Sequence, residues 1–270
     1  MEIIHDSIER GHIRHALFDF DGTISLIREG WQQVMIPMMV DILQELNTGE
    51  SRADLTAVVT EFVERLTGKQ TIYQMIELAE EIRKRGGTPL DPLDYKHRYL
   101  DLLWERIKDR VAALKEGRAR PDDMMVPGAR EFLQALHARG VHCYLASGTD
   151  EKYVLDEAAA LGVIRYFQGV YGAIDDYQNY SKKMVIERII RENGLKGSEF
   201  AAFGDGYVEI ENAKAVGGIA IGVASNEATR CGIDAWKRNR LIQAGADLII
   251  PDFREWQPLV AYLLDKAPSA

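Results

Sequence analysis

Residues 16–23, Ala-Leu-Phe-Asp-Phe-Asp-Gly-Thr, constrain the fold and the chemistry of this chain more than any other stretch. The apolar run at residues 16–18 is typical of a parallel β-strand that is covered on both faces. Two carboxylates, Asp19 and Asp21, follow at once, and Gly22 allows the backbone to turn away sharply. Because open α/β sheets bind ligands at the carboxyl ends of their strands, we expect a functional site here.

The spacing of the two carboxylates indicates a shared chemical task. If the strand pleat persists, Asp19 and Asp21 face the same side and repel each other. A bound divalent cation, or one proton shared unequally, relieves that repulsion. Such a pair suits phosphoryl transfer, in which one carboxylate attacks phosphorus and the second serves as acid and then base. The alternative is two solvated aspartates in a turn.

Length and charge limit the kinds of protein to consider. A chain of 270 residues, 46% of them hydrophobic, forms one large domain or two moderate ones. The net charge of -9, from 33 basic and 42 acidic residues, argues against nucleic acid or an anionic membrane as partner. Cys143 and Cys231 lack the spacing of a disulfide framework or a zinc site. No apolar run suits a signal peptide or membrane helix, so the expected location is the reduced cytoplasm.

Helical periodicity predicts an all-helical insert at residues 25–123. No strand pattern occurs in this segment, and Pro37 is expected to kink or restart its first helix. We expect helices at residues 31–46, 55–66, 71–84 and 94–115.

After the insert, strand and helix patterns alternate to the end of the chain. This alternation predicts βαβ units and a doubly wound parallel sheet, an α/β fold. We therefore predict a core domain formed by residues 1–24 and 124–270, and a helical cap domain at residues 25–123. For residues 1–12 the pattern leaves a short helix and an edge strand equally open.

The motif Asp-Phe-Asp-Gly-Thr at residues 19–23 resembles the first signature of the haloacid dehalogenase (HAD) superfamily of phosphohydrolases. The insert that follows it resembles the helical cap of the phosphoglycolate phosphatase and β-phosphoglucomutase branch. Residues 126–133 resemble the return from cap to core in the same family. The resemblance implies a Rossmann-like core, with Asp19 as the nucleophile and Asp21 as the acid and base.

The second HAD signature is expected at Ser147. This residue ends the apolar run at residues 141–146 and is followed by Gly148 and Thr149. A small hydroxyl group and free backbone N–H groups can hold phosphate oxygens. Taken alone, capping of the next helix would be the better explanation. Its place at the next strand end after the insert favours Ser147 and Gly148 as phosphate ligands.

The third signature is a lysine that offsets the negative charge gathered at the site. In HAD proteins this lysine precedes an apolar helix. Lys182 stands three and four residues before Val185 and Ile186 and is therefore preferred, with Lys183 as the second candidate. The alternative is a solvated lysine at the start of a helix.

The fourth signature is acidic, at residues 203–209, and resembles the family's Gly-Asp-x-x-x-Asp motif. An oxygen-rich site at a strand end suits Mg²⁺. The resemblance implies that Asp19, Asp205 and the backbone carbonyl of Asp21 bind this ion. Glu209 replaces the usual second aspartate, and its longer arm can bind the metal directly, through water, or hold Asp205 and Lys182 instead. Glu209 at the start of a helix, favoured by the helix dipole, is the structural alternative.

These four signatures together predict Mg²⁺-dependent hydrolysis of a small phosphorylated metabolite, with Ser147 and Lys182 holding phosphoryl oxygens. A phosphomutase of the same branch would use the same residues, and Thr23 agrees better with a phosphatase. A dehalogenase is disfavoured, since that branch lacks the second aspartate, Asp21. A phosphate-sensing domain without catalysis is the non-enzymatic alternative. The oligomeric state cannot be predicted.

Selectivity for the rest of the substrate is expected to come from the cap, since the core signatures address the phosphoryl group. The polar break at residues 67–71 contains Lys69 and Gln70, which can reach an anionic or hydroxylated substrate end. Arg28, just past the first signature, is a further candidate, with Trp31 beside it. An ordinary solvated turn is an equally good explanation for Lys69 and Gln70.

Overall fold

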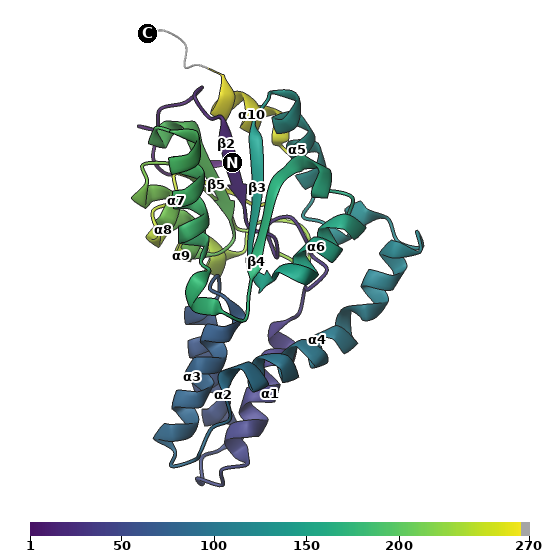
Figure 1. Cartoon of the computed structure of the whole chain (residues 1–270), viewed down its shortest axis with the longest axis vertical. Helices are drawn as coiled ribbons and strands as arrows, with labels where there is room; N and C mark the ends of the chain where they lie inside the picture. The colour runs from purple at the N-terminus through teal and green to yellow at the C-terminus, as the bar shows by residue number, and fades with distance from the viewer. Residues whose placement is uncertain (266–270) are drawn as a thin grey trace.

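A seven-stranded sheet forms the centre of the molecule, a computed structural model described here for residues 1–265 (Figure 1). All neighbouring strands are parallel except the N-terminal pair, β1 and β7, which is antiparallel. The N-terminal residues thus form the edge strand that the sequence left as one of two alternatives. In spatial order the strands are β1 (Glu2–Ile3), β7 (Leu248–Ile250), β6 (Ile219–Val223), β5 (Phe200–Gly204), β2 (His15–Phe18), β3 (His142–Asp150) and β4 (Phe167–Ala173).

Helices cover both faces of the sheet, and consecutive side chains of the central strand enter different layers. Phe18 packs in one apolar cluster with Phe132, whereas Leu17, its neighbour in β2, packs in another with Ile210. Both faces of β2 are buried, which explains its unbroken apolar run. The predicted doubly wound α/β fold is therefore confirmed. Within residues 1–265, one face carries α5 (Ala129–Ala138), α6 (Glu151–Ala160) and α10 (Trp256–Leu264), and the other carries α7 (Lys182–Asn193), α8 (Tyr207–Ala215) and α9 (Ala235–Gln243).

The segment between β2 and α5 is helical and contributes no strand to the sheet within the described chain, as the sequence predicted. The first helix continues through Pro37, so of the two predicted effects the restart does not occur, and a kink stays a prediction. Buried methionines on both sides of the proline, Met35 and Met38, hold the helix against the apolar core. None of the described helices is both long and apolar enough to cross a membrane. The long helices are α1 (Gln32–Gln44), α2 (Arg52–Leu66), α3 (Thr71–Lys84) and α4 (Pro92–Lys115), and the short 3₁₀ turns are η1 (Pro121–Met124), η2 (Ile164–Tyr166), η3 (Tyr177–Asn179) and η4 (Gly197–Glu199).

The longest helix, α4, connects the projecting helices α1–α3 with the sheet layer (Figure 1). Near its start, Lys96 is buried and lies 2.7 Å from Asp150 at the end of β3. At its end, Lys115 lies 2.7 Å from Asp156 of α6. One apolar cluster also contains buried residues both of α1–α4 and of the strands. The helices therefore pack closely on the core, while the domain boundaries near residues 24 and 124 stay a prediction.

Candidate active site

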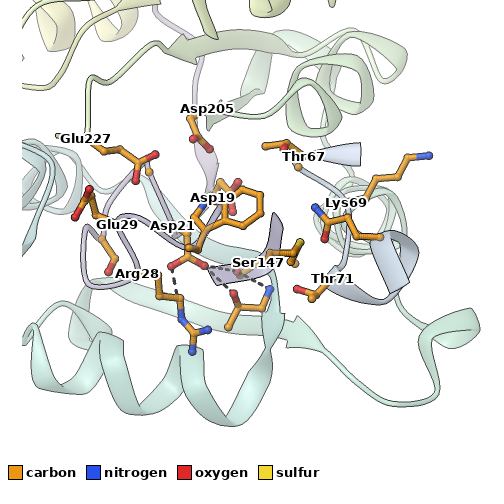
Figure 2. Close-up of a pocket in the computed structure, with 18 of the residues that line it drawn as sticks. Asp19, Asp21, Arg28, Glu29, Thr67, Lys69, Thr71, Ser147, Asp205 and Glu227 are labelled. Atoms are coloured by element: carbon orange, nitrogen blue, oxygen red, sulfur yellow. Dashed lines mark hydrogen bonds and ion pairs between the residues drawn. The ribbon is translucent and has the colours of Figure 1, made fainter. Parts of the chain in front are cut away.

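The carboxyl ends of three adjacent strands bring the predicted signature residues together. β5, β2 and β3 are neighbours in the sheet, so the segments at their ends meet at one edge. Asp19 and Asp21 follow β2, Asp205 follows β5, and Ser147 lies in β3. Figure 2 shows these side chains around one cavity, whose water-accessible volume is about 100 Å³. Residues of α1, α3, α4 and the turn before α3 form the opposite wall.

Asp19 is buried at the end of β2 and is held firmly in place. Its backbone N–H donates to the carbonyl of Phe203 at 2.9 Å, and its Oδ1 accepts from the N–H of Phe20 at 2.7 Å. Oδ1 also lies 2.9 Å from Nζ of Lys182. Burial raises the pKa of Asp19, and the charge of Lys182 opposes that rise. Since Oδ2 has no hydrogen-bond partner within residues 1–265, this oxygen is free to act on a substrate.

Of the two candidate lysines, Lys182 is the one that reaches the cavity. It opens α7, is 4% exposed, and contacts both Asp19 and Glu209. Burial alone lowers the pKa of a lysine, but the two carboxylates outweigh this effect and raise the pKa of Lys182. Lys183 is exposed, and its Nζ lies 3.7 Å from Glu187 of the same helix. Lys183 therefore has no contact with the site.

Asp21 has one occupied and one free carboxylate oxygen. Oδ2 accepts a hydrogen bond from the hydroxyl of Thr149 at 2.8 Å and lies 3.5 Å from the Ser147 hydroxyl (Figure 2). Oδ1 is buried and has no hydrogen-bond partner in the described chain. Burial raises the pKa of Asp21, although Arg28 and Thr149 oppose the rise. A raised pKa favours the protonated form that a general acid requires.

β3 extends further than the sequence predicted. We expected the apolar strand at residues 141–146 to end in Ser147, Gly148 and Thr149, but Asp150 still pairs with Ala173 of β4 after a shift of register. Residues 147–149 therefore lie in an irregular part of the strand, directly before the N-cap of α6 at Asp150. The Ser147 hydroxyl accepts the backbone N–H of Thr149 at 3.0 Å, which fixes its direction beside Asp21.

The turn at residues 67–71, called the cap loop below, rests directly on the core. A Cβ atom at Gly148 would lie 2.6 Å from the carbonyl oxygen of Lys69, so only glycine allows this approach. Gln70 is buried, and its amide donates to the backbone carbonyls of Tyr180 at 2.7 Å and Tyr177 at 3.3 Å. Gln70 does not line the cavity, and its role here is to attach the cap loop to the core.

Lys69 and Arg28 line the cavity, but both side chains are engaged elsewhere. The Lys69 ammonium lies 5.7 Å from the ring centre of Tyr73, and Figure 2 shows its side chain extending away from Asp19 and Asp21. The Arg28 guanidinium is hydrogen-bonded to Glu157 of α6. Arg28 lies 3.9 Å from Asp21, which is farther than the 2.9 Å between Lys182 and Asp19.

Asp205 is balanced by a lysine from α9. Its Oδ2 lies 2.8 Å from Nζ of Lys237, which also lies 2.7 Å from Glu227. The two carboxylates outweigh the effect of burial and raise the pKa of Lys237. On the backbone, the N–H of Asp205 donates to the hydroxyl of Thr23 at 3.0 Å, which ties the end of β5 to the first motif.

Glu209 is fully buried and pairs with Lys182 rather than facing the cavity. Its Oε2 has no hydrogen-bond partner among the described residues. This geometry matches one of the roles that the sequence left open for Glu209, that of holding the lysine. A direct contact between Glu209 and a metal stays a prediction.

The oxygen donors at this edge fit Mg²⁺. No three His, Cys, Asp or Glu side chains within residues 1–265 converge closely enough to form a metal site alone. Mg²⁺, however, usually takes only one or two carboxylates and keeps several waters. Asp19 and Asp205 line the cavity, and each has one carboxylate oxygen without a protein partner in the described chain. Together with the backbone carbonyl of Asp21, they form a suitable oxygen donor set.

Several residues of the site were not identified from the sequence. Thr149 was visible as part of the second signature, but its contact with Asp21 was not foreseen. Glu157, Glu227 and Lys237 stand far from any signature, and no spacing pattern marked them. Their positions follow from the packing of α6 and α9 and of the loop before α9.

The family model of haloacid dehalogenase-like hydrolases matches residues 13–217, which include all four signatures. The chain belongs to this family. The family prediction and the prediction of an enzyme are thereby confirmed. Among curated proteins, the phosphoglycolate phosphatases of Escherichia coli (strain K12) and Shigella sonnei (strain Ss046) are each 26% identical over 219 residues. The match covers 78% of this chain and 81% of theirs.

Solved structures of other HAD proteins share the fold at low sequence identity. A predicted phosphoglycolate phosphatase of Haemophilus somnus 129PT has a TM-score of 0.61 and 16% identity, over 92% of this chain and 98% of that one. A β-phosphoglucomutase of Clostridium difficile has a TM-score of 0.59 and 13% identity, over 92% of this chain and 99% of that one. At these identities the similarity concerns the fold alone.

The buried cluster around Lys182 predicts an unequal effect of two neighbouring substitutions. Lys182→Met leaves Asp19 and Glu209 buried without their cation, which should cost about 3–5 kcal/mol of unfolding free energy at pH 7. Lys183→Met, the matched control, should change it by less than about 0.5 kcal/mol. Urea denaturation measures both.

The loss of unfolding free energy caused by Lys182→Met should depend on pH. Without Lys182 the pKa of Asp19 rises further, so the folded protein retains a proton that the unfolded chain has released. The destabilisation should therefore be smaller at pH 5 than at pH 7. Equal destabilisation by both lysine substitutions would contradict the assignment of Lys182 to the buried cluster.

Proposed function

We propose that this enzyme is a Mg²⁺-dependent phosphatase that hydrolyses a small phosphate monoester through an aspartyl-phosphate intermediate. The observation that carries the proposal is the state of Asp19: a buried carboxylate beside Lys182 with one oxygen free toward the cavity. The similarity to phosphoglycolate phosphatases over 78% of the chain supports hydrolysis. A phosphomutase is the alternative, since β-phosphoglucomutases share the fold.

Each residue around the cavity has a separate role in the proposed reaction. Asp19 attacks phosphorus through Oδ2, and the bond between phosphorus and the leaving oxygen breaks. Asp21 donates a proton to that oxygen and later accepts one from the water that hydrolyses the acyl phosphate. Lys182 offsets the charge of the phosphoryl oxygens, which the Ser147 hydroxyl and the Gly148 N–H bind.

Asp19, Asp205 and the backbone carbonyl of Asp21 would hold Mg²⁺. When bound, the ion supplies positive charge that stabilises the phosphoryl group during transfer. The need is electrostatic, because Asp19, Asp21 and Asp205 surround a space that must accept a phosphate dianion.

The size of the cavity favours a small phosphorylated metabolite. A water-accessible volume of about 100 Å³ leaves little room beyond the phosphoryl group and a short leaving group. In this proposal the cap loop, which contacts the core at Gly148, covers part of this space and limits the entry of water during the reaction. Of the predicted substrate contacts, we retain Lys69, because its flexible side chain starts at the cavity wall.

The first prediction for this mechanism concerns the nucleophile. Asp19→Asn should fold normally but lower kcat to less than about one thousandth of the wild-type value, because an amide does not attack phosphorus. Release of inorganic phosphate from a panel of phosphorylated metabolites is the measurement. Substantial residual turnover in a folded sample would exclude the covalent mechanism, and a phosphorylated isomer without free phosphate would indicate a mutase.

The second prediction concerns the metal. After treatment with a chelator, phosphate release should fall to background and return on addition of MgCl₂. Mg²⁺ should also raise the melting temperature of the wild-type protein, and less so that of Asp205→Asn, because binding to the folded state stabilises it. Full activity in excess chelator, with no metal in the protein, would disprove the Mg²⁺ requirement.

The third prediction concerns selectivity. If Lys69 contacts the leaving group, Lys69→Ala should lower kcat/KM about 10-fold or more for the best metabolite but little for p-nitrophenyl phosphate. The exposed Lys183→Ala serves as control for the loss of one positive charge. An equal loss on both substrates, or on neither, would leave the cap loop as a purely structural element.

A further inference from the structure

A buried ion pair outside the four signatures lies beside the proposed general acid. Arg28, in the segment between β2 and α1, is 6% exposed, and Glu157 of α6 is 2% exposed. The Arg28 Nε donates to both Glu157 oxygens, at 3.1 and 3.2 Å, and Nη2 donates to Oε1 at 2.7 Å. The carboxylate thus binds two of the three guanidinium nitrogens and determines the direction of the group.

The same guanidinium lies close to Asp21 without forming a hydrogen bond to it. Nε of Arg28 is 3.9 Å from Oδ1 of Asp21, beyond hydrogen-bond distance (Figure 2). Oδ1 has no other hydrogen-bond partner within residues 1–265, while Oδ2 is occupied by Thr149. Oδ1 is therefore a buried oxygen of Asp21 that no protein group in the described chain occupies.

Without Glu157, the N–H donors of the Arg28 guanidinium would be free to bind another carboxylate. Arg forms short, two-pronged hydrogen bonds with carboxylates, and Asp21 is the carboxylate next to it. Such a bond would hold the carboxyl group of Asp21 on Arg28 and compete with its contact to the leaving oxygen. The fixed separation of 3.9 Å leaves the positive charge nearby but Oδ1 unoccupied.

We propose that Glu157 is a positioning residue that holds Arg28 away from Asp21, so that the carboxyl group of Asp21 can turn toward the leaving oxygen and exchange a proton with it. The inference rests on the proposed phosphatase function. In the first step the proton on Asp21 moves to the leaving oxygen as the bond between that oxygen and phosphorus breaks. In the second step Asp21 accepts a proton from the water that attacks the acyl phosphate, and the bond between phosphorus and Asp19 breaks, which restores Asp19 as a carboxylate.

The dependence of kcat on the leaving group distinguishes a positioning role of Glu157 from a merely structural one. An alkoxide is a poor leaving group and needs a general acid, whereas p-nitrophenolate leaves without protonation. Loss of packing around α6 would affect both kinds of ester equally. A fault in the delivery of the Asp21 proton affects mainly the alkyl ester.

The test compares Glu157→Gln with the matched control Asp156→Asn, its neighbour in α6. Asp156 pairs with Lys115 and has no hydrogen bond to Arg28. With the alkyl phosphate that wild type hydrolyses fastest, Glu157→Gln should lower kcat about 10-fold or more with little change in KM. With p-nitrophenyl phosphate the loss should stay within about 3-fold. Asp156→Asn should match wild type on both substrates.

A second variant shows whether Arg28 causes the loss. In the double variant Arg28→Met/Glu157→Gln no guanidinium can reach Asp21, so kcat for the alkyl phosphate should exceed that of Glu157→Gln alone. If Glu157→Gln does not fold, Glu157→Asp takes its place, since its shorter carboxylate reaches less far toward Arg28, holds the guanidinium less firmly and should cause a loss with the same selectivity for the alkyl ester.

Two results would overturn the inference. One is an equal loss of kcat on the alkyl and aryl phosphates by Glu157→Gln, or by Glu157→Asp in its place. The other is a double variant less active than the single one, which would mean that Arg28 itself contacts the substrate. Failure of the wild-type enzyme to release phosphate from either ester would instead reject the proposed function.

Discussion

The neutralisation of buried carboxylates is the constraint on which the rest of this structure depends. Asp19, Asp21, Asp205 and Glu209 all gather at one edge of the sheet, and burial raises the pKa of Asp19 and of Asp21 there. A buried charge is tolerated only when it is paired. The fold meets this need with Lys182, which lies between Asp19 and Glu209 and links α7 and α8 to the end of β2.

The order of the sheet determines which residues take part in this balance. β2 lies between β5 and β3, so the segments after β5 and within β3 are the ones that reach Asp19. Thr23 accepts the backbone N–H of Asp205, and Thr149 donates to Asp21. Hydroxyl groups of two segments thus connect the three strand ends directly. The arrangement is rigid enough to fix the two aspartates of the first motif in different environments.

Those environments separate the roles of the two aspartates. Asp19 has a lysine within hydrogen-bond distance, which favours a carboxylate able to attack. Asp21 instead has a hydroxyl donor at 2.8 Å and a guanidinium at 3.9 Å, while burial raises the pKa of both aspartates. Two identical side chains, two residues apart, therefore differ in chemistry because their neighbours differ.

The sequence predicted what local pattern determines. The apolar run before Asp19, the alternation after residue 124 and the helical periodicity of residues 25–123 were enough for the fold. The preference for Lys182 over Lys183 rested on its spacing from the apolar face of α7, and burial of Lys182 beside Asp19 follows from that spacing. What could not be predicted were contacts that depend on tertiary packing.

Glu157 and Lys237 illustrate this limit. Each stands in a helix of mixed composition, where a single charged residue is normally solvated, and only the packing of α6 and α9 on the sheet buries it. The extension of β3 to Asp150 likewise depends on its pairing with β4, which no local pattern shows. The hydrogen bond from the Gln70 amide to a backbone carbonyl of the core also depends on tertiary packing.

The position of α9 joins the site to the cap loop through two neighbouring cations. Lys237 contacts Asp205, and one turn later Arg240 donates to backbone carbonyls at the end of α2, those of Arg65 at 2.7 Å and Thr67 at 3.1 Å. These carbonyls lie in the last turn of α2 and at the start of the cap loop. No following helical turn supplies an N–H group to bind them. A single rigid helix therefore holds both a proposed metal ligand and the segment that closes the cavity. Because the distance between two residues of one helix is fixed, a displacement of the cap loop that pulls on Arg240 also acts on the contact of Lys237 with Asp205. The position of the cap loop and the charge balance of the site are therefore coupled through α9.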